Sequence, residues 1–247
     1  DTGNFKKNLS DCLKLSDYNS FESRKKISLR NNKYRGIGIS TYIEACGGGG
    51  PEYCYLKVGG NGNIEVKIGT QSNGQGHVTS YSQIVSEVLA IDINQVNIIQ
   101  GNSIEIPKGS GTGGSRSMPV GGNALYLASI KFLKNTQELL AKHFKTEINN
   151  IFYEKGLFKF NNKNYSFSDL TKLFNTLESF NIEADWSPTP GTYTYPNGTH
   201  ICELEIDKSS GFVKIINYSV IDDFGKVINP LLLEGQVHGG IAQGIGQ

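Results

Sequence analysis

The sequence predicts an α+β fold in which antiparallel hairpins carry flanking helices, with a division into two lobes. Alternating apolar and polar residues at 53–58 and 64–68 predict one hairpin, and residues 202–206 and 212–221 predict another. Apolar residues at helical spacing follow the first hairpin and again follow Gly122. Hairpins and helices therefore alternate along the chain, which is typical of an α+β domain.

Composition narrows the class of protein before any motif is considered. The chain has 247 residues and a formal net charge of +1, so we expect no general affinity for nucleic acid or for an acidic membrane. It has no run of about 18 apolar residues, and we predict no transmembrane segment. Its 4 cysteines form no C-x-x-C pair and no cluster with zinc or iron–sulfur spacing, so we assign no metal ligands.

The stretch at 70–83, T-Q-S-N-G-Q-G-H-V-T-S-Y-S-Q, lies between a predicted strand and a predicted helix. Gly74 and Gly76 let the backbone approach a ligand closely or adopt a positive φ. Gln75 between them can donate and accept hydrogen bonds, and the N-terminus of the following helix favours an anion. The alternative is a plain tight turn in which Thr79 or Ser80 caps the helix.

Two later stretches favour the ligand over the plain turn. Residues 111–122, G-T-G-G-S-R-S-M-P-V-G-G, again lie between a predicted strand and a long predicted helix. They combine glycines, hydroxyls and one guanidinium, which are groups that bind a phosphate or pyrophosphate. Residues 235–247, G-Q-V-H-G-G-I-A-Q-G-I-G-Q, repeat the Gly/Gln chemistry. Three such loops indicate one elongated, anionic, hydrogen-bonding ligand.

These motifs carry a family resemblance. In order, G-Q-G-H-x-T, G-T-G-G-S-R-S and D-D-x-G-x-x-x-N-P-x-x-x-x-G-Q-V-H-G-G-x-x-Q-G-x-G resemble the large, molybdenum-binding subunit of molybdenum hydroxylases. That family includes xanthine dehydrogenase, aldehyde oxidase and aerobic carbon-monoxide dehydrogenase. The residues of the motifs are most similar to those of the bacterial carbon-monoxide-dehydrogenase-type large chain. The resemblance covers residues 1–247, with a weaker patch at about 145–189.

The resemblance implies a cofactor and assigns residues to it. The cofactor would be a molybdopterin dinucleotide, expected in its cytosine form, held chiefly by hydrogen bonds. Gln75 matches the catalytic glutamine beside the molybdenum, the loop at 114–117 matches the pterin and pyrophosphate loop, and the last motif also lines the cofactor. The implied cofactor-binding residues are Gly74, Gln75, Gly76, Gly113, Gly114, Ser115, Arg116, Ser117, Gln236 and Gln243.

The resemblance also implies an oxidoreductase. The full enzyme would oxidise CO, an aldehyde or an N-heterocycle with water as oxygen source, and would pass electrons to partner subunits that carry iron–sulfur clusters and FAD. We expect a cytoplasmic dimer of heterotrimers. Because both ends look cut, we expect the catalytic glutamate of a G-x-G-E motif beyond Gln247 and the substrate loop before Asp1. The alternatives are a non-enzymatic fragment that folds without cofactor, or another nucleotide-binding module, which the lack of a Walker lysine disfavours.

The chain is expected to divide into four segments of one molybdopterin-binding domain. The segments are a connector and surface helix at 1–35, a first α+β lobe with two glycine-rich cofactor loops at 36–150, a hairpin, short helix and linker at 151–190, and the second hairpin with the Gly/Gln-rich cofactor loop at 191–247.

Within the second hairpin, Glu203 and Glu205 alternate with apolar residues, so we expect both to face solvent.

Overall fold

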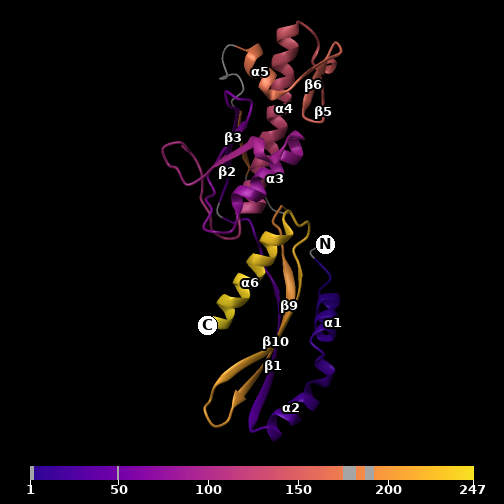
Figure 1. Cartoon of the computed structure of the whole chain (residues 1–247), viewed down its shortest axis with the longest axis vertical. Coiled ribbons are helices and arrows are strands. Elements are labelled where there is room, and N and C mark those ends of the chain that lie inside the picture. Colours follow the sequence, from indigo (N-terminus) through magenta and orange to yellow (C-terminus); the bar gives the residue numbers. More distant parts are fainter. Residues whose placement is uncertain (1–2, 49, 175–181, 187–191) are drawn as a thin grey trace. The chain divides into compact units, whose positions relative to one another are not determined.

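The structure, a computed structural model, confirms the α+β class and divides the chain into two units (Figure 1). Unit 1 contains residues 1–46 and 194–226, and unit 2 contains residues 47–193 and 227–247. This division differs from the expected lobes because the strand at 33–43 pairs with the strand at 197–207, far along the sequence. The residues described are 3–48, 50–174, 182–186 and 192–247.

Unit 1 is built on a three-stranded antiparallel sheet of order β1-β9-β10. Strand β1 (Lys33–Ile43) pairs with β9 (Asn197–Asp207), and β10 (Val213–Asp223) forms the predicted hairpin with β9. Helices α1 (Phe5–Leu15) and α2 (Phe21–Arg30) pack against this sheet. A 3-10 turn, η1 (Tyr18–Ser20), divides them, where one surface helix was expected.

Helix α2 is fastened to the sheet by charge, and this corrects the expectation that two glutamates face solvent. Glu203 is only 2% exposed and accepts hydrogen bonds from Nη2 of Arg24 at 2.9 Å and Nε of Arg35 at 2.6 Å. Glu205 accepts from Oγ of Ser28 at 2.6 Å. Burial disfavours the charged form of Glu203, but the two guanidinium groups outweigh it and hold the pKa of that carboxyl below its usual range.

Unit 2 contains a four-stranded sheet of order β4-β3-β2-β8. Strands β2 (Glu52–Val58) and β3 (Ile64–Ile68) form the predicted antiparallel hairpin, and β8 (Ile182–Trp186) pairs with β2 on its other side. Strand β4 (Val96–Ile99) runs parallel to β3. The connection from β3 to β4 passes through helix α3 (His77–Leu89) and a 3-10 turn, η2 (Ile93–Gln95). A parallel pair needs such a crossover.

The core of unit 2 lies between this sheet and two helices. Every second residue of β2 and β3 is buried, as a sheet covered on one face requires. Helix α4 (Asn123–Phe144) continues directly from a π-helical turn, η3 (Ser117–Gly122). The residues that fill the core, all fully buried, are Leu56, Ile64, Val66, Ile68, Tyr81, Val85, Leu89, Leu125, Ala128, Phe132 and Leu140.

A small antiparallel sheet follows the C-terminal end of α4 and a 3-10 turn, η4 (Ile148–Asn150). Its strands are β5 (Phe152–Glu154), β6 (Leu157–Phe160) and β7 (Lys163–Tyr165), one strand more than the hairpin that the sequence predicts, and α5 (Phe167–Leu173) follows. Both two-residue turns have positive φ at each position, at 155–156 and 161–162, which is the geometry that joins tight hairpins.

The Gly/Gln-rich C-terminal stretch is a helix, α6 (Pro230–Gly246), and the expectation of a loop there is wrong. Asn229 caps it by accepting a hydrogen bond from the N–H of Leu232 at 3.0 Å, and proline occupies the first turn. These start signals and the apolar run after them outweigh the helix penalty of the scattered glycines. No residue of α6 is buried. Across the described ranges, no helix has the length and apolarity needed to cross a membrane.

Candidate functional site

Two glycine-rich segments of unit 2 define the candidate site. We call residues 69–76 loop A and residues 109–117 loop B. Loop A connects β3 to α3, and loop B leads into η3 and α4. Each segment thus precedes the N-terminus of a helical element, as the sequence predicts, and that end of a helix carries unpaired N–H groups and favours an anion.

Hydrogen bonds join loops A and B to each other. The hydroxyl of Thr112 in loop B donates to the carbonyl of Gln71 at 2.7 Å and accepts from the N–H of Gln71 at 3.0 Å. The hydroxyl of Tyr81 in α3 donates to the carbonyl of Ser117 at 2.9 Å and lies 2.7 Å from Oγ1 of Thr70. The structure therefore brings two stretches, separated by a strand and a helix in the sequence, into one site.

Loop A presents Gln75 beside two glycines with different surroundings. The side-chain oxygen of Gln75, which is half-buried, accepts a hydrogen bond from the N–H of Asn73, so the amide folds back on its own loop. At Gly74 (φ +113°) an added Cβ would meet nothing within 4 Å, so the space there is open. At Gly76 (φ +76°) a Cβ would lie 2.5 Å from Cδ2 of Leu232, so the start of α6 packs on this glycine.

Loop B presents backbone and hydroxyl groups at an exposed tip. Gly113, Gly114 and Ser115 are exposed, and a Cβ at either glycine would meet no atom within 4 Å. Ser115 adopts a left-handed conformation (φ +51°) and Arg116 a right-handed one. Alternation of this kind turns successive N–H groups toward one side and forms an anion-binding concavity. The hydroxyl of Ser117 lies 3.3 Å from that of Thr112.

The side chain of Arg116 lies inside the protein. The residue is 2% exposed, and Nη1 contacts Oε2 of Glu52, which is fully buried, at 2.6 Å. The remaining N–H groups donate to the carbonyls of Gly48, Gly50, Pro51 and Gly111. A guanidinium has five N–H groups, and these contacts engage all of them. The sequence predicts that this guanidinium binds a phosphate, whereas in the structure it binds a carboxylate and backbone carbonyls of the same chain.

Glu52 is the partner that the sequence analysis missed. A signal was present, because Glu52 stands in the alternating register of Cys54, Leu56 and Val58, all of which face the core. A carboxylate in phase with a buried face requires a charged partner. Nothing in the local sequence shows that this partner is Arg116.

His77, the first residue of α3, has a structural role. It is 3% exposed, its ring stacks on Tyr81 with centroids 5.0 Å apart, and its Nδ1 lies 3.4 Å from Nε2 of Gln100. Burial lowers the pKa of His77, so the neutral imidazole is favoured. It therefore connects the first turn of α3 to Gln100, the residue after β4, as an uncharged group.

Gln236 and Gln243 lie on α6 and are exposed. They are two helical turns apart, and residues at this spacing lie on the same face of a helix. The start of α6 is held near loop A by the contact of Leu232 with Gly76 and by a hydrogen bond of 2.9 Å from Nδ2 of Asn229 to Oε1 of Gln83. The cofactor role of the two glutamines stays a prediction.

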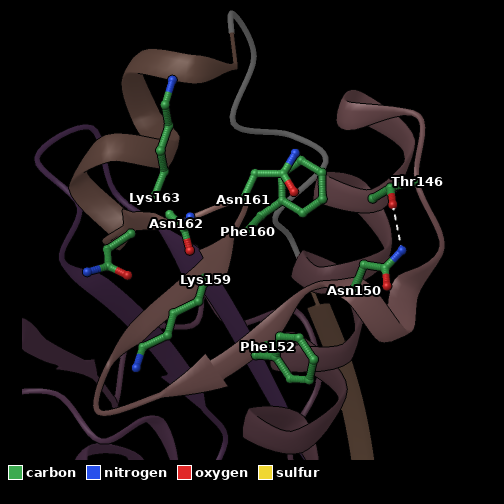
Figure 2. Close-up of a pocket in the computed structure, with 9 residues that line it drawn as sticks. Thr146, Asn150, Phe152, Lys159, Phe160, Asn161, Asn162 and Lys163 are labelled. Carbon is green, nitrogen blue, oxygen red and sulfur yellow. Dashed lines mark hydrogen bonds between the residues drawn. The ribbon is translucent and has the colours of Figure 1, made fainter.

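A separate polar hollow of about 760 Å³ lies on the small sheet of unit 2 (Figure 2). None of the predicted site residues lines it. Within the hollow, Nδ2 of Asn150 donates to Oγ1 of Thr146 at 2.8 Å. Thr146 follows the C-terminal end of α4, whereas loop B leads toward its N-terminus, and a helix of 22 residues is about 33 Å long. The hollow is therefore distinct from the candidate site. Its lining residues are Thr146, Asn150, Phe152, Lys159, Phe160, Asn161, Asn162, Lys163 and Asn164.

The donors of loops A and B fit a molybdopterin dinucleotide. They are backbone N–H groups, hydroxyls and amides around open glycines, which suits a ligand with a pyrophosphate and many hydrogen-bonding atoms. The nearby carboxylate of Glu52 is neutralised by Arg116, so it does not repel an anion. Within the ranges that the structure describes, no three His, Cys, Asp or Glu residues are grouped in a way that holds a metal ion.

Comparisons with known proteins agree with this chemistry. The family model described as "Molybdopterin cofactor-binding domain" matches residues 11–247. The chain is 29% identical to the carbon monoxide dehydrogenase large chain of Hydrogenophaga pseudoflava, over 99% of this chain and 33% of that protein. It is 27% identical to the nicotine 6-hydroxylase large subunit of Paenarthrobacter nicotinovorans, over 99% of this chain and 33% of that protein. The chain therefore spans about a third of the length of these curated relatives.

Solved structures show the same fold. A Cu,Mo-CO dehydrogenase in its carbon monoxide reduced state matches with a TM-score of 0.79 and 28% identity, over 96% of this chain and 33% of that one. Quinoline 2-oxidoreductase from Pseudomonas putida 86 has a TM-score of 0.83 at 24% identity, over 99% of this chain and 34% of that one, which is a likeness of fold. The match over residues 11–247 identifies this chain as a member of the molybdopterin cofactor-binding domain family.

Proposed function

We propose that this chain is part of the large subunit of a molybdenum hydroxylase and that loops A and B hold a molybdopterin dinucleotide, in its cytosine form. The observation that carries the proposal is the direct joining of the two loops by Thr112 and Gln71 and by Tyr81 and Ser117. These contacts hold the two motifs that resemble the family next to each other, and the open space at their glycines supports a shared ligand.

Each predicted residue takes a specific part in this proposal. Gln75 turns its amide from the loop toward the ligand, and the exposed tip at 113–115 offers its N–H groups and the hydroxyl of Ser115. The hydroxyl of Ser117 completes this set, while Gly74 keeps the approach to loop A open. Gln236 and Gln243 extend the donor set along one face of α6. The buried guanidinium of Arg116 stabilises loop B through its contacts with Glu52 and the carbonyl of Gly111.

The proposed reaction is oxidation of a small substrate. When bound, the molybdenum cofactor supplies two-electron oxidation with water as the source of oxygen. The relatives are named for CO, nicotine, 6-hydroxypseudooxynicotine, aldehyde and xanthine, so the substrate class is CO, an aldehyde or an N-heterocycle. Iron–sulfur and flavin subunits would accept the electrons in a cytoplasmic dimer of heterotrimers. Gln75 would hold and orient groups at the reacting centre by hydrogen bonds.

The test is Gln75→Ala in the full-length enzyme assembled with its partner subunits. We expect loss of turnover with molybdenum content and melting temperature close to those of the parent, because Gln75 is a loop residue outside the core. The matched control is Asn94→Ala, which removes an exposed amide in η2, after α3. Near-normal turnover of Gln75→Ala at full molybdenum content would contradict the assignment. A purified parent that holds a nucleotide without molybdenum would favour the nucleotide-binding alternative.

A further inference from the structure

We propose that the buried pair of Glu52 and Arg116 is a positioning device that fixes the backbone of loop B, and through it the groups that hold the phosphate portion of the cofactor. This inference rests on the function proposed above. Glu52 and Arg116 are therefore positioning residues, and neither touches the ligand. The pair links the start of strand β2 to loop B.

The contacts of Arg116 connect two segments of backbone and one carboxylate. Its Nε donates to the carbonyl of Gly48 at 3.2 Å, and its Nη2 donates to the carbonyls of Gly50 and Pro51, each at 3.0 Å. Its Nη1 donates to the carbonyl of Gly111 and to Glu52. One side chain thus ties the turn before β2 to the first half of loop B and to the carboxylate at the start of β2.

Glu52 holds the same loop from the other side. Its Oε1 accepts from the N–H of Tyr53 at 3.0 Å, and its Oε2 accepts from Arg116 and lies 3.4 Å from the N–H of Ser110. Loop B is therefore attached at 110–111 and at 116, which leaves the exposed tip at 113–115 between two fixed points. This arrangement sets the position and direction of the N–H groups at the tip.

Two glycines make room for this arrangement. A Cβ at Gly109 would lie 2.4 Å from Cα of Gly69, and a Cβ at Gly69 would lie 2.2 Å from Oε1 of Glu52. Real Cβ atoms do not occupy such distances, so loop B crosses the end of β3 only because both positions are glycine. The close crossing brings the backbone of loop B onto the buried carboxylate.

The energetics favour a geometric role. A buried ion pair generally stabilises a fold no more than well-packed apolar residues of the same size, because the desolvation of both charges offsets their attraction. A planar guanidinium with five fixed donors, however, defines the positions of several carbonyls at once. Lysine keeps the charge but has three donors on a flexible stem, so Arg116→Lys separates charge from geometry.

The experiment uses the full-length protein and two measurements. The first is hydrogen exchange of the cofactor-free protein, compared between 109–117 and β3. The second is the rate at which molybdenum and nucleotide leave the loaded enzyme, with kcat per bound molybdenum measured alongside. The variants are Arg116→Lys and Glu52→Gln. Gly109→Ala displaces the same loop without changing a charge, and it carries the test if a charge variant does not fold. Leu140→Ala, a fully buried core position in the C-terminal half of α4, is the control for destabilisation.

We expect exchange in 109–117 to rise about 10- to 100-fold in Arg116→Lys, since charged hydrogen bonds are lost, while β3 is unchanged. Cofactor loss should accelerate by a similar factor with kcat per molybdenum preserved. Leu140→Ala should lower the melting temperature without faster cofactor loss. The inference is overturned if exchange in 109–117 stays at the parent rate, or if Leu140→Ala matches Arg116→Lys in cofactor loss at equal melting temperature. The exchange result does not need a cofactor, so it separates failure of this inference from failure of the proposed function.

Discussion

The two units each bury a glutamate beside arginine, and they use the pair differently. In unit 1, Glu203 meets two side chains, Arg24 from α2 and Arg35 from β1, so charge attaches a helix to a sheet. In unit 2, Arg116 meets one carboxylate and gives its other N–H groups to backbone carbonyls. The same chemistry thus joins secondary-structure elements in one unit and fixes an irregular backbone segment in the other.

The largest expected effect concerns unit 2 and the cofactor groups of loop B, whose backbone Arg116 fixes. Ser115→Ala combined with Ser117→Ala in the full-length enzyme should lower the molybdenum and nucleotide that remain after purification, with little change in kcat per molybdenum. Each lost hydrogen bond to a charged group costs about 1.5–3 kcal/mol of binding free energy. Ser209→Ala with Ser210→Ala, in the β9–β10 turn of unit 1, is the matched control and should leave cofactor content unchanged. Unchanged stoichiometry in the loop B variant would count against the assignment.

The next largest effect comes from removing the charge of Glu203, which pairs with Arg24 and Arg35 in unit 1. Glu203→Gln should lower the free energy of opening of β9 and β10 by about 3 kcal/mol, because two arginines lose a buried carboxylate. This value is at the low end of the range for buried pairs, since the side chain of Arg24 is 23% exposed. Native-state hydrogen exchange measures the change strand by strand. Glu22→Gln removes an exposed carboxylate 3.9 Å from Lys25 and should change stability by less than about 0.5 kcal/mol. An equal effect of both substitutions would contradict the role of the buried pair.

The smallest expected effect is a decrease in the stability of unit 1 at acidic pH. Hydrogen bonds from Ser28 and Lys33 lower the pKa of Glu205, and the arginines lower that of Glu203 against the effect of burial, both from 4.5. A folded pKa below the unfolded one means that the unfolded chain binds more protons, so stability is fully present above pH 4.5 and decreases as pH falls below it. We expect Glu203→Gln to flatten this decrease in a pH series of urea unfolding curves. A variant with the same slope as the parent would show that other groups cause it.

Local patterns predicted most of the regular structure. Alternation gave β2, β3, β9 and β10, and helical spacing gave α3 and most of α4, because these features depend on neighbours within a few residues. The missed features depend on residues far apart. Glu203 alternates with apolar residues as a solvent-facing residue does, and only α2, from the start of the chain, shows that its face is covered.

The same limit applies to the candidate site. Glycines and polar residues in the sequence predict loops A and B, and hydrogen bonds in the structure join them. A guanidinium in a glycine-rich loop, however, fits a phosphate and a buried carboxylate equally well in sequence. Glu52 decides between them, and it lies 64 residues before Arg116. The final glycine-rich stretch is a helix and not the predicted loop, because the cap at Asn229 and the apolar run after it outweigh the glycines.

The discontinuous units have a consequence for synthesis and folding. The segment that carries loops A and B with β2, β3, α3 and α4 is contiguous, so it can fold soon after it leaves the ribosome. Strand β1 is made earlier, and its partner among the described strands is β9, which is made much later. Until then its backbone N–H and C=O groups form an unpaired strand edge, which is a template for wrong pairing. Unit 1 is therefore the slow-folding part of the chain, and its early strand is where a chaperone has most to protect.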